Sequence, residues 1–301
     1  MSEYKDYMVR ATAASDQIRA FAITSRNLVE EARKSHETSP IMTAALGRLM
    51  SATLMMGCMM DNDGDVLTVK IEGDGPAVML LATADAKGNV KGYVKNNKVY
   101  LENNASGHLN VGGAVGNGNL TVIRDMGLKE PYVGQVPLYT GEIAEDITYY
   151  YAKSEQTPSS VGLGVLINPD ESVKEAGGFI IQLLPFAKEE TIDQLEKNIK
   201  SFSSVTDVLK AGKTPEEMLE ILLHGFDIKW NGTMGVNWHC DCSKDRTARG
   251  LQLIGVQELD SIIEDGKTIE TKCQFCGKTY NFTIDEVKKI REKAANVISH
   301  S

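Results

Sequence analysis

The sequence lacks the features that mark export and membrane insertion. Its longest strongly apolar stretch is the twelve residues 49–60, well short of the roughly 20 needed to cross a bilayer as a helix. The first eight residues include charged side chains where a signal peptide would need an apolar run. We therefore expect a cytoplasmic protein with no membrane association.

Basic charge is also scarce. The chain has 32 Lys and Arg against 41 Asp and Glu, a formal net charge of −9. Proteins that bind nucleic acid through a broad face depend on many Lys and Arg contacts to phosphate. The acidic balance therefore argues against a nucleic-acid partner.

The glycine-containing segments do not form a nucleotide site. Three Gly-Lys-Thr tripeptides begin at Gly212, Gly266 and Gly277, but none has the earlier glycine that a P-loop requires. A glycine-rich stretch at 107–118 is followed by a strand pattern rather than by a helix whose N-terminus could hold phosphate. We expect no nucleotide cofactor, and no residue pattern in the chain predicts a catalytic site or an enzyme.

Cysteine is rare, with five in 301 residues, yet four of the five lie close together in the last quarter. Cys240 and Cys242 form a Cys-x-Cys pair, and Cys273 and Cys276 form a Cys-x-x-Cys pair. The 30 residues between the pairs let the chain fold back and bring four sulfurs to one point, as a tetrahedral zinc site requires. Thiols this close in sequence can also form disulfides, so the group supports a metal-bound state and an oxidised state.

The residues alone leave open whether this site is a permanent zinc ribbon or a redox switch. Structural zinc contributes on the order of 10–16 kcal/mol, as much as the whole stability of a typical domain, about 5–15 kcal/mol. A small module around the cysteines should therefore unfold without its metal, and oxidation competes for the same sulfurs. The fifth cysteine, Cys58, lies in an apolar helix pattern and is expected to be a buried structural thiol.

The first 185 residues predict a mixed α/β core. Alternating apolar residues indicate strands at 7–13, 18–23, 66–72, 77–84, 90–94, 120–125, 132–139, 161–167 and 179–184. Helical periodicity indicates helices at 26–35, 40–60 and 142–155, the second with Ser39 as its N-cap. We expect an α+β fold class in which β-sheets pack on helices.

Beyond residue 185 the pattern becomes helical only. Residues 189–226 contain short amphipathic helices, one of which begins with the capping signal Thr214-Pro215-Glu216-Glu217. Helices of this length are marginal in isolation, so they should dock on the preceding sheet. We predict three parts: a core at 1–185, a helical linker at 186–231 and a zinc-binding module at 232–301. In that module we expect helices at 243–251, 257–264 and 285–297, with the second cysteine pair at the tip of a hairpin.

Several segments together resemble the 33 kDa chaperonin family, the redox-regulated heat-shock chaperones of bacteria. They are Cys240-Asp-Cys-Ser-Lys-Asp-Arg246, Cys273-Gln-Phe-Cys276, Asp125-Met-Gly-Leu-Lys-Glu-Pro-Tyr-Val-Gly134, Gly141-Glu-Ile-Ala-Glu-Asp146, Ser154-Glu-Gln-Thr-Pro-Ser-Ser160 and Gly177-Gly-Phe-Ile-Ile-Gln-Leu-Leu-Pro185. The resemblance covers nearly the whole chain. One departure is Asp245, where the family usually has Glu, which keeps the charge.

The resemblance implies an ATP-independent holdase that is inactive while reduced, with one zinc ion on Cys240, Cys242, Cys273 and Cys276. It implies that oxidation joins Cys240 to Cys242 and Cys273 to Cys276, releases zinc, and disorders the module and linker. The activated form, often a homodimer, would then hold unfolded or partly folded client proteins. A thiol-disulfide oxidoreductase that uses the cysteine pairs is the alternative, and a zinc-ribbon nucleic-acid binder is disfavoured by the acidic balance.

Overall fold

The computed structural model describes residues 5–298, which form two compact units. One unit runs to His239 and the other begins at Cys240. Among the described residues, no helix is both long and apolar enough to cross a membrane. The predicted mixed α+β fold class is confirmed.

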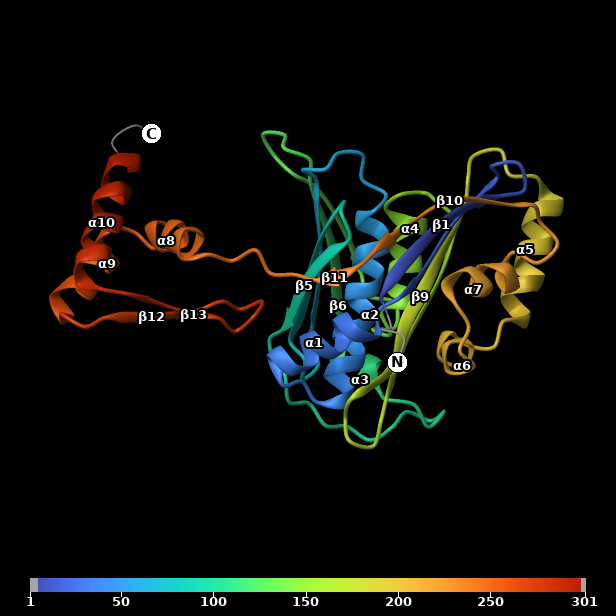
Figure 1. Ribbon diagram of the computed structural model, residues 1–301, viewed down its shortest axis with the longest axis horizontal. Coiled ribbons are helices and arrows are strands. Elements are labelled where there is room, and N and C mark those ends of the chain that lie inside the picture. The colour runs from blue at the N-terminus through green and yellow to red at the C-terminus, as the bar shows by residue number, and fades with distance from the viewer. Residues whose placement is uncertain (1–4, 299–301) are drawn as a thin grey trace. The chain divides into compact units, whose positions relative to one another are not determined.

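The larger unit contains two sheets (Figure 1). The first sheet has the order β10 (Ile228–Gly235), β1 (Tyr7–Ala13), β2 (Ile18–Thr24), β9 (Val173–Leu183), β8 (Ser159–Ile167). The second has the order β11 (Asn237–Trp238), β5 (Asn89–Val94), β4 (Met79–Asp85), β3 (Val66–Gly73), β6 (Gly118–Asp125), β7 (Tyr132–Pro137). All neighbouring strands are antiparallel except the short β11–β5 pair.

Helix α2 (Pro40–Gly57) lies between the two sheets and contacts strands of both (Figure 1). Nearly every side chain along α2 is buried, as expected for a helix that is apolar on all sides. The other helices of this unit are α1 (Arg26–His36), α3 (Val111–Val115), α4 (Ala144–Lys153), α5 (Glu189–Ser201), α6 (Val205–Lys210) and α7 (Pro215–Leu222).

Helices α5, α6 and α7 cover the face of the first sheet that points away from α2. They form a second apolar core with β1, β2 and β9, built from residues that include Val9, Ala11, Phe179, Leu195, Leu209, Leu219 and Leu222. The expected docking of these helices on the sheet is therefore confirmed. The capping signal of α7 also forms, because Thr214 Oγ1 accepts a hydrogen bond from Glu217 N and Glu217 Oε2 accepts one from Thr214 N.

Three local features go beyond the predictions from sequence. Ser39 is the N-cap residue of α2, as predicted, but its side chain makes no cap hydrogen bond; its hydroxyl donates to the Val99 carbonyl at 2.7 Å. The glycine-rich stretch contains the five-residue helix α3, which the sequence did not predict because the stretch has no helical pattern of apolar residues. Strands β10 and β11 were not predicted, and they place residues 228–238 in the sheets of the larger unit.

The smaller unit contains α8 (Lys244–Gln252), α9 (Val256–Asp265), the hairpin β12 (Ile269–Lys272) and β13 (Thr279–Phe282), and α10 (Ile284–Ile298). Its elements follow the predicted order. Its apolar core is small, formed by the buried side chains of Leu259, Tyr280, Phe282, Val287, Ile290 and Ala294.

Candidate metal centre

The four C-terminal cysteines converge on one point. Their Sγ atoms all lie within 4.8 Å of one another. Cys240 Sγ is 3.7 Å from Cys273 Sγ, and Cys242 Sγ is 3.3 Å from Cys276 Sγ. Zinc–sulfur bonds of ~2.3 Å in a tetrahedron separate the sulfurs by about 3.8 Å, so the four thiols fit a zinc ion. All four are free and half-buried, a position that an oxidant can reach.

The hairpin β12–β13 positions the second pair. Cys273 N donates to the Lys278 carbonyl at 2.9 Å, and Gly277 N donates to the Cys273 carbonyl at 2.9 Å. Gly277 has φ +70°, a left-handed conformation that glycine adopts without strain. The chain therefore turns sharply after Cys276, at the tip of the predicted hairpin, and both sulfurs of the pair lie within the four-sulfur cluster.

The first pair, Cys240 and Cys242, lies directly before helix α8. Ser243 is its N-cap, and its hydroxyl accepts a hydrogen bond from Arg246 N at 3.1 Å. Arg246 also forms an ion pair with Asp241, the residue between the two cysteines. The N-cap hydrogen bond orders the start of α8 next to Cys242, and the ion pair, which is exposed on both sides, adds little to it.

Tyr280 is a part of the site that sequence reasoning missed. Its hydroxyl donates a hydrogen bond to Cys242 Sγ at 3.1 Å, and its ring is buried in the small core. Tyr280 stands on β13 and pairs with Thr271 on β12, so the hairpin register decides which cysteine it reaches. Its distance in sequence from Cys242 gave no signal of this contact.

The thiols differ in acidity. Burial acts to raise the pKa of Cys242, but hydrogen bonds from Tyr280 and from the other cysteines lower it to about 7. Burial raises the pKa of Cys240 and of Cys276 above the usual range. Zinc binds thiolates, and it would hold all four deprotonated. The fold already holds the four sulfurs within 4.8 Å of one another, which is the arrangement that four zinc-bound thiolates need.

Cys58 lies outside this cluster. It is buried at the end of α2, and burial raises the pKa of its thiol to about 11. Such a thiol is a weak nucleophile at neutral pH. The expectation of a buried cysteine is confirmed.

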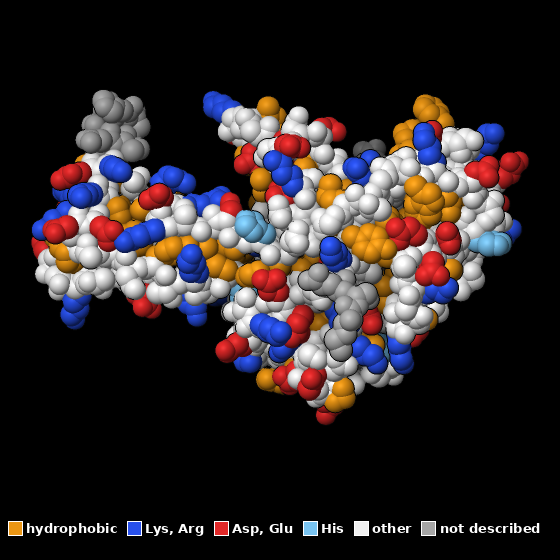
Figure 2. All heavy atoms as spheres, viewed as in Figure 1, with side chains coloured by type: hydrophobic (Ala, Val, Ile, Leu, Met, Phe, Trp, Pro, Cys, Tyr) orange, Lys and Arg blue, Asp and Glu red, His pale blue; other side chains and the backbone are white. Residues whose placement is uncertain are grey.

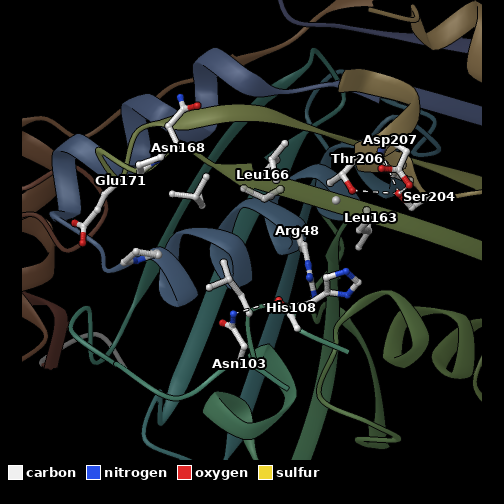
Figure 3. A pocket seen from close by; sticks show the side chains of 18 of the residues that line it. Arg48, Asn103, His108, Leu163, Leu166, Asn168, Glu171, Ser204, Thr206 and Asp207 are labelled. Carbon is white, nitrogen blue, oxygen red and sulfur yellow. Dashed lines mark hydrogen bonds between the residues drawn. The ribbon is translucent and has the colours of Figure 1, made fainter. Parts of the chain in front are cut away.

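A cleft of about 830 Å³ lies elsewhere, in the larger unit (Figure 3). Arg48 and His108 lie next to each other on one side of it, and Ser204, Thr206 and Asp207 line another wall. Several of these polar groups already have partners: Arg48 Nη1 donates to Glu142 Oε2 at 2.6 Å, and Ser204 Oγ donates to Asp207 Oδ2 at 2.8 Å. Because α6 forms one wall, the cleft depends on the docking of that helix.

The surface shows mixed charge. On the face drawn in Figure 2, Lys and Arg side chains are interspersed with Asp and Glu, and no continuous basic area covers it. The view agrees with the acidic balance of the sequence, which disfavours broad contact with phosphate.

The fold and the site together define a two-unit α+β protein whose smaller unit is built around four thiols suited to one zinc ion. The family model described as "Hsp33 protein" matches residues 6–283. The chain belongs to the Hsp33 family.

Similar proteins share nearly the whole chain. The 33 kDa chaperonin of Agathobacter rectalis is 58% identical over 286 residues, 95% of this chain and 99% of that protein. The 33 kDa chaperonin of Clostridioides difficile is 53% identical over 287 residues, 95% and 98% of the two chains. The crystal structure of the 33 kDa chaperonin from Thermotoga maritima matches with a TM-score of 0.88 and 33% identity, and covers 97% of this chain and 100% of that one.

Proposed function

We propose that this protein is an ATP-independent chaperone that is switched on by oxidants. The observation that carries the proposal is the convergence of four half-buried thiols within a unit whose own apolar core is small. Membership of a family whose relatives are named chaperonins supports the chaperone part. In the reduced form, one zinc ion on Cys240, Cys242, Cys273 and Cys276 would keep the protein inactive.

Zinc would supply a folding anchor to the smaller unit. Structural zinc contributes on the order of 10–16 kcal/mol. The six buried side chains of the small core contribute a similar gross amount, at roughly 1.5–3 kcal/mol each, but ordering the backbone costs about 1–2 kcal/mol for every residue of the unit, so this core alone does not offset the cost of folding. Loss of the metal therefore unfolds this unit. The four cysteines are ligands rather than catalytic groups.

Oxidation removes the ligands. Hydrogen peroxide takes two electrons from each cysteine pair, so that two thiols become one disulfide and the peroxide becomes two water molecules. We propose that Cys240 joins Cys242 and that Cys273 joins Cys276. In the folded unit the closest sulfurs belong to different pairs, but only the partners within a pair stay close in sequence once the unit unfolds.

The helices α5, α6 and α7 are proposed to be the linker that loosens next. Each is short, and together they bury residues such as Leu195, Leu209 and Leu219 against the first sheet. Their release would expose an apolar sheet face to unfolding proteins. The division into a core at 1–185, a linker at 186–231 and a redox module at 232–301 remains our proposal; in the folded state, β10 and β11 join part of that module to the larger unit.

The proposal makes the protein a cytoplasmic holdase for unfolded or partly folded proteins, a homodimer when active, and not an enzyme. The test is to dilute a chemically unfolded protein into buffer with reduced, zinc-loaded chain or with peroxide-treated chain under mild heat. Light scattering should fall only with the oxidised form. Equal suppression by both forms would rule out the switch.

One observation favours a second candidate, a thiol-disulfide oxidoreductase. Hydrogen bonds lower the pKa of Cys242 to about 7, which is in the range of exchange-active thiols. Catalytic turnover in insulin reduction would support this candidate. Reduction of no more than one insulin disulfide per protein would exclude it.

A further inference from the structure

Strand β10 is the edge strand of the first sheet, and it is weakly held next to the well-buried strand β1. Six of its eight residues are exposed, it contains Gly232 at φ +114° and Gly235, and its pairing with β1 is interrupted by a register shift opposite Arg10 and Ala11. Glycine is costly in strands and carries no side chain to pack. On its other edge β10 has no strand neighbour in the described chain. Apart from its backbone pairing, only Ile228 and Met234 of β10 pack against the apolar cores, and both are partly buried.

Strand β1, in contrast, is well buried: one face is apolar, and the other carries Met8 beside the half-buried Arg10 and Thr12. Met8 packs into the core around α2, and Val9, Ala11 and Ala13 pack into the core under α5–α7. These residues are 0–2% exposed. Without β10, β1 would be a seven-residue edge with unpaired main-chain groups and one continuous apolar face, which is the type of edge that accepts another strand.

The chain attaches β10 to the two elements that the proposed function releases. It follows α7 directly, and β11 and Cys240 come directly after it. The Tyr7 hydroxyl of β1 donates a hydrogen bond to Glu216 of α7 at 2.7 Å. Both α7 and β10 therefore contact β1. On the C-terminal side, the two-residue β11 pairs with β5, and His239 N donates to the Val90 carbonyl at 2.8 Å. If α7 and the segment from β11 onward both unfold, β10 loses the ordered elements that precede and follow it in the chain.

We propose that β10 is a removable edge strand and that the β1 edge it leaves binds an extended apolar segment of an unfolded protein by antiparallel strand addition. The inference rests on the proposed function and adds its recognition mode. The occupant is a polypeptide because β10 itself shows that an antiparallel strand fits this edge, with Met8 opposite Met234 and Val9 opposite Thr233. Figure 2 shows exposed hydrophobic side chains over the region where Figure 1 draws β1 and β10, and Trp230 of β10 is 43% exposed.

The ladder geometry supplies a test at single amides. Val236 N donates to the Asp6 carbonyl at 3.2 Å, and Tyr7 N faces β2, where it donates to Thr24 Oγ1 at 3.4 Å. Main-chain groups alternate along an antiparallel pair, so the amide of Met8 faces β10 and the amide of Val9 faces β2. Met8 therefore reports on the edge, and Val9 is its internal control.

The experiment measures amide hydrogen exchange, resolved to single residues, in the full chain. Three samples are compared: reduced with zinc, oxidised alone, and oxidised with carboxymethylated, permanently unfolded α-lactalbumin. Met8 should lose protection on oxidation and regain it with the unfolded protein, while Val9 stays protected throughout. Light scattering on the same oxidised sample shows whether aggregation is suppressed.

Each other outcome overturns the inference. If aggregation is suppressed but Met8 stays protected on oxidation, or does not regain protection with the unfolded protein, the function stands and the edge is not its site. Protection that returns without client as the protein concentration rises would mean that a second copy fills the edge. Absence of suppression removes the proposed function together with the inference.

Two proline variants provide a second test that needs no oxidation. By the same alternation, the amide of Met234 faces β1 and that of Thr233 points away. Met234→Pro removes a ladder donor, whereas Thr233→Pro is tolerated as an edge proline. With zinc content confirmed, Met234→Pro should gain aggregation suppression while reduced, Thr233→Pro should not, and Met234→Ala controls for the side chain. Equal suppression by the two proline variants would refute the inference.

Discussion

Replacement of Leu219 by alanine should undock the linker helices while the zinc site remains loaded. Leu219 is 0% exposed in the core between α7 and the first sheet. The substitution removes about three carbons, at ~0.8 kcal/mol each, and leaves a cavity. Buried Leu→Ala changes cost about 2–5 kcal/mol in total. A middle value of about 3 kcal/mol corresponds to a more than 100-fold increase in the open population of α7.

The assay is amide hydrogen exchange in α7 of the reduced, zinc-loaded protein, with aggregation suppression measured in parallel. Ile221→Ala is the matched control, because Ile221 is on the same helix but 42% exposed, and surface changes are usually within about 0.5 kcal/mol. Leu219→Ala should exchange about 100-fold faster and suppress aggregation without oxidant. Exchange no faster than that of Ile221→Ala would refute the packing argument, and fast exchange without suppression would refute the masking role of the helices.

Three further predictions concern the metal site and the fold. Cys276→Ser should lose zinc and the helical signal of the smaller unit, whereas Cys58→Ser should retain both; zinc content and circular dichroism decide. Tyr280→Phe removes the hydrogen bond to Cys242 Sγ and should weaken zinc binding by about 10–100-fold in chelator competition; unchanged affinity would contradict the role of the hydroxyl. Burial raises the pKa of Asp6 from 3.8 to about 6. The folded protein is therefore more stable while this carboxyl is protonated, and that contribution to the free energy of unfolding is lost as pH rises from 3.8 to about 6. Asp6→Asn should gain up to about 3 kcal/mol relative to wild type between pH 4 and pH 7 in denaturant unfolding, and a pH-independent difference would contradict the assignment.

Much of the larger unit could be predicted because its elements carry strong periodic patterns. The strand at Tyr7–Ala13 and the start of α2 at Pro40 agree with the sequence-based boundaries. Strand β10 could not be predicted, because its exposed residues and two glycines give no apolar alternation. Its place depends on the edge of β1, a partner more than 200 residues away. Ser39 shows the same limit, since Val99 outcompetes the helix end for its hydroxyl.

The four cysteines were predictable because their spacing within each pair is a local property. Their convergence, with all Sγ atoms within 4.8 Å, agrees with that prediction. Tyr280 was not predictable, since its contact with Cys242 arises from the register of a hairpin and the fold of the whole unit. The disulfide pairing, the zinc ion and the client surface remain proposals.

The most direct test of the central claim is one peroxide titration under mild heat that follows zinc release, free thiols and aggregation suppression together. The account predicts that one zinc ion and the four thiols of Cys240, Cys242, Cys273 and Cys276 are lost together, that Cys58 stays reduced, and that suppression rises in step with zinc release. Full loss of zinc and of the four thiols with no rise in suppression would contradict it.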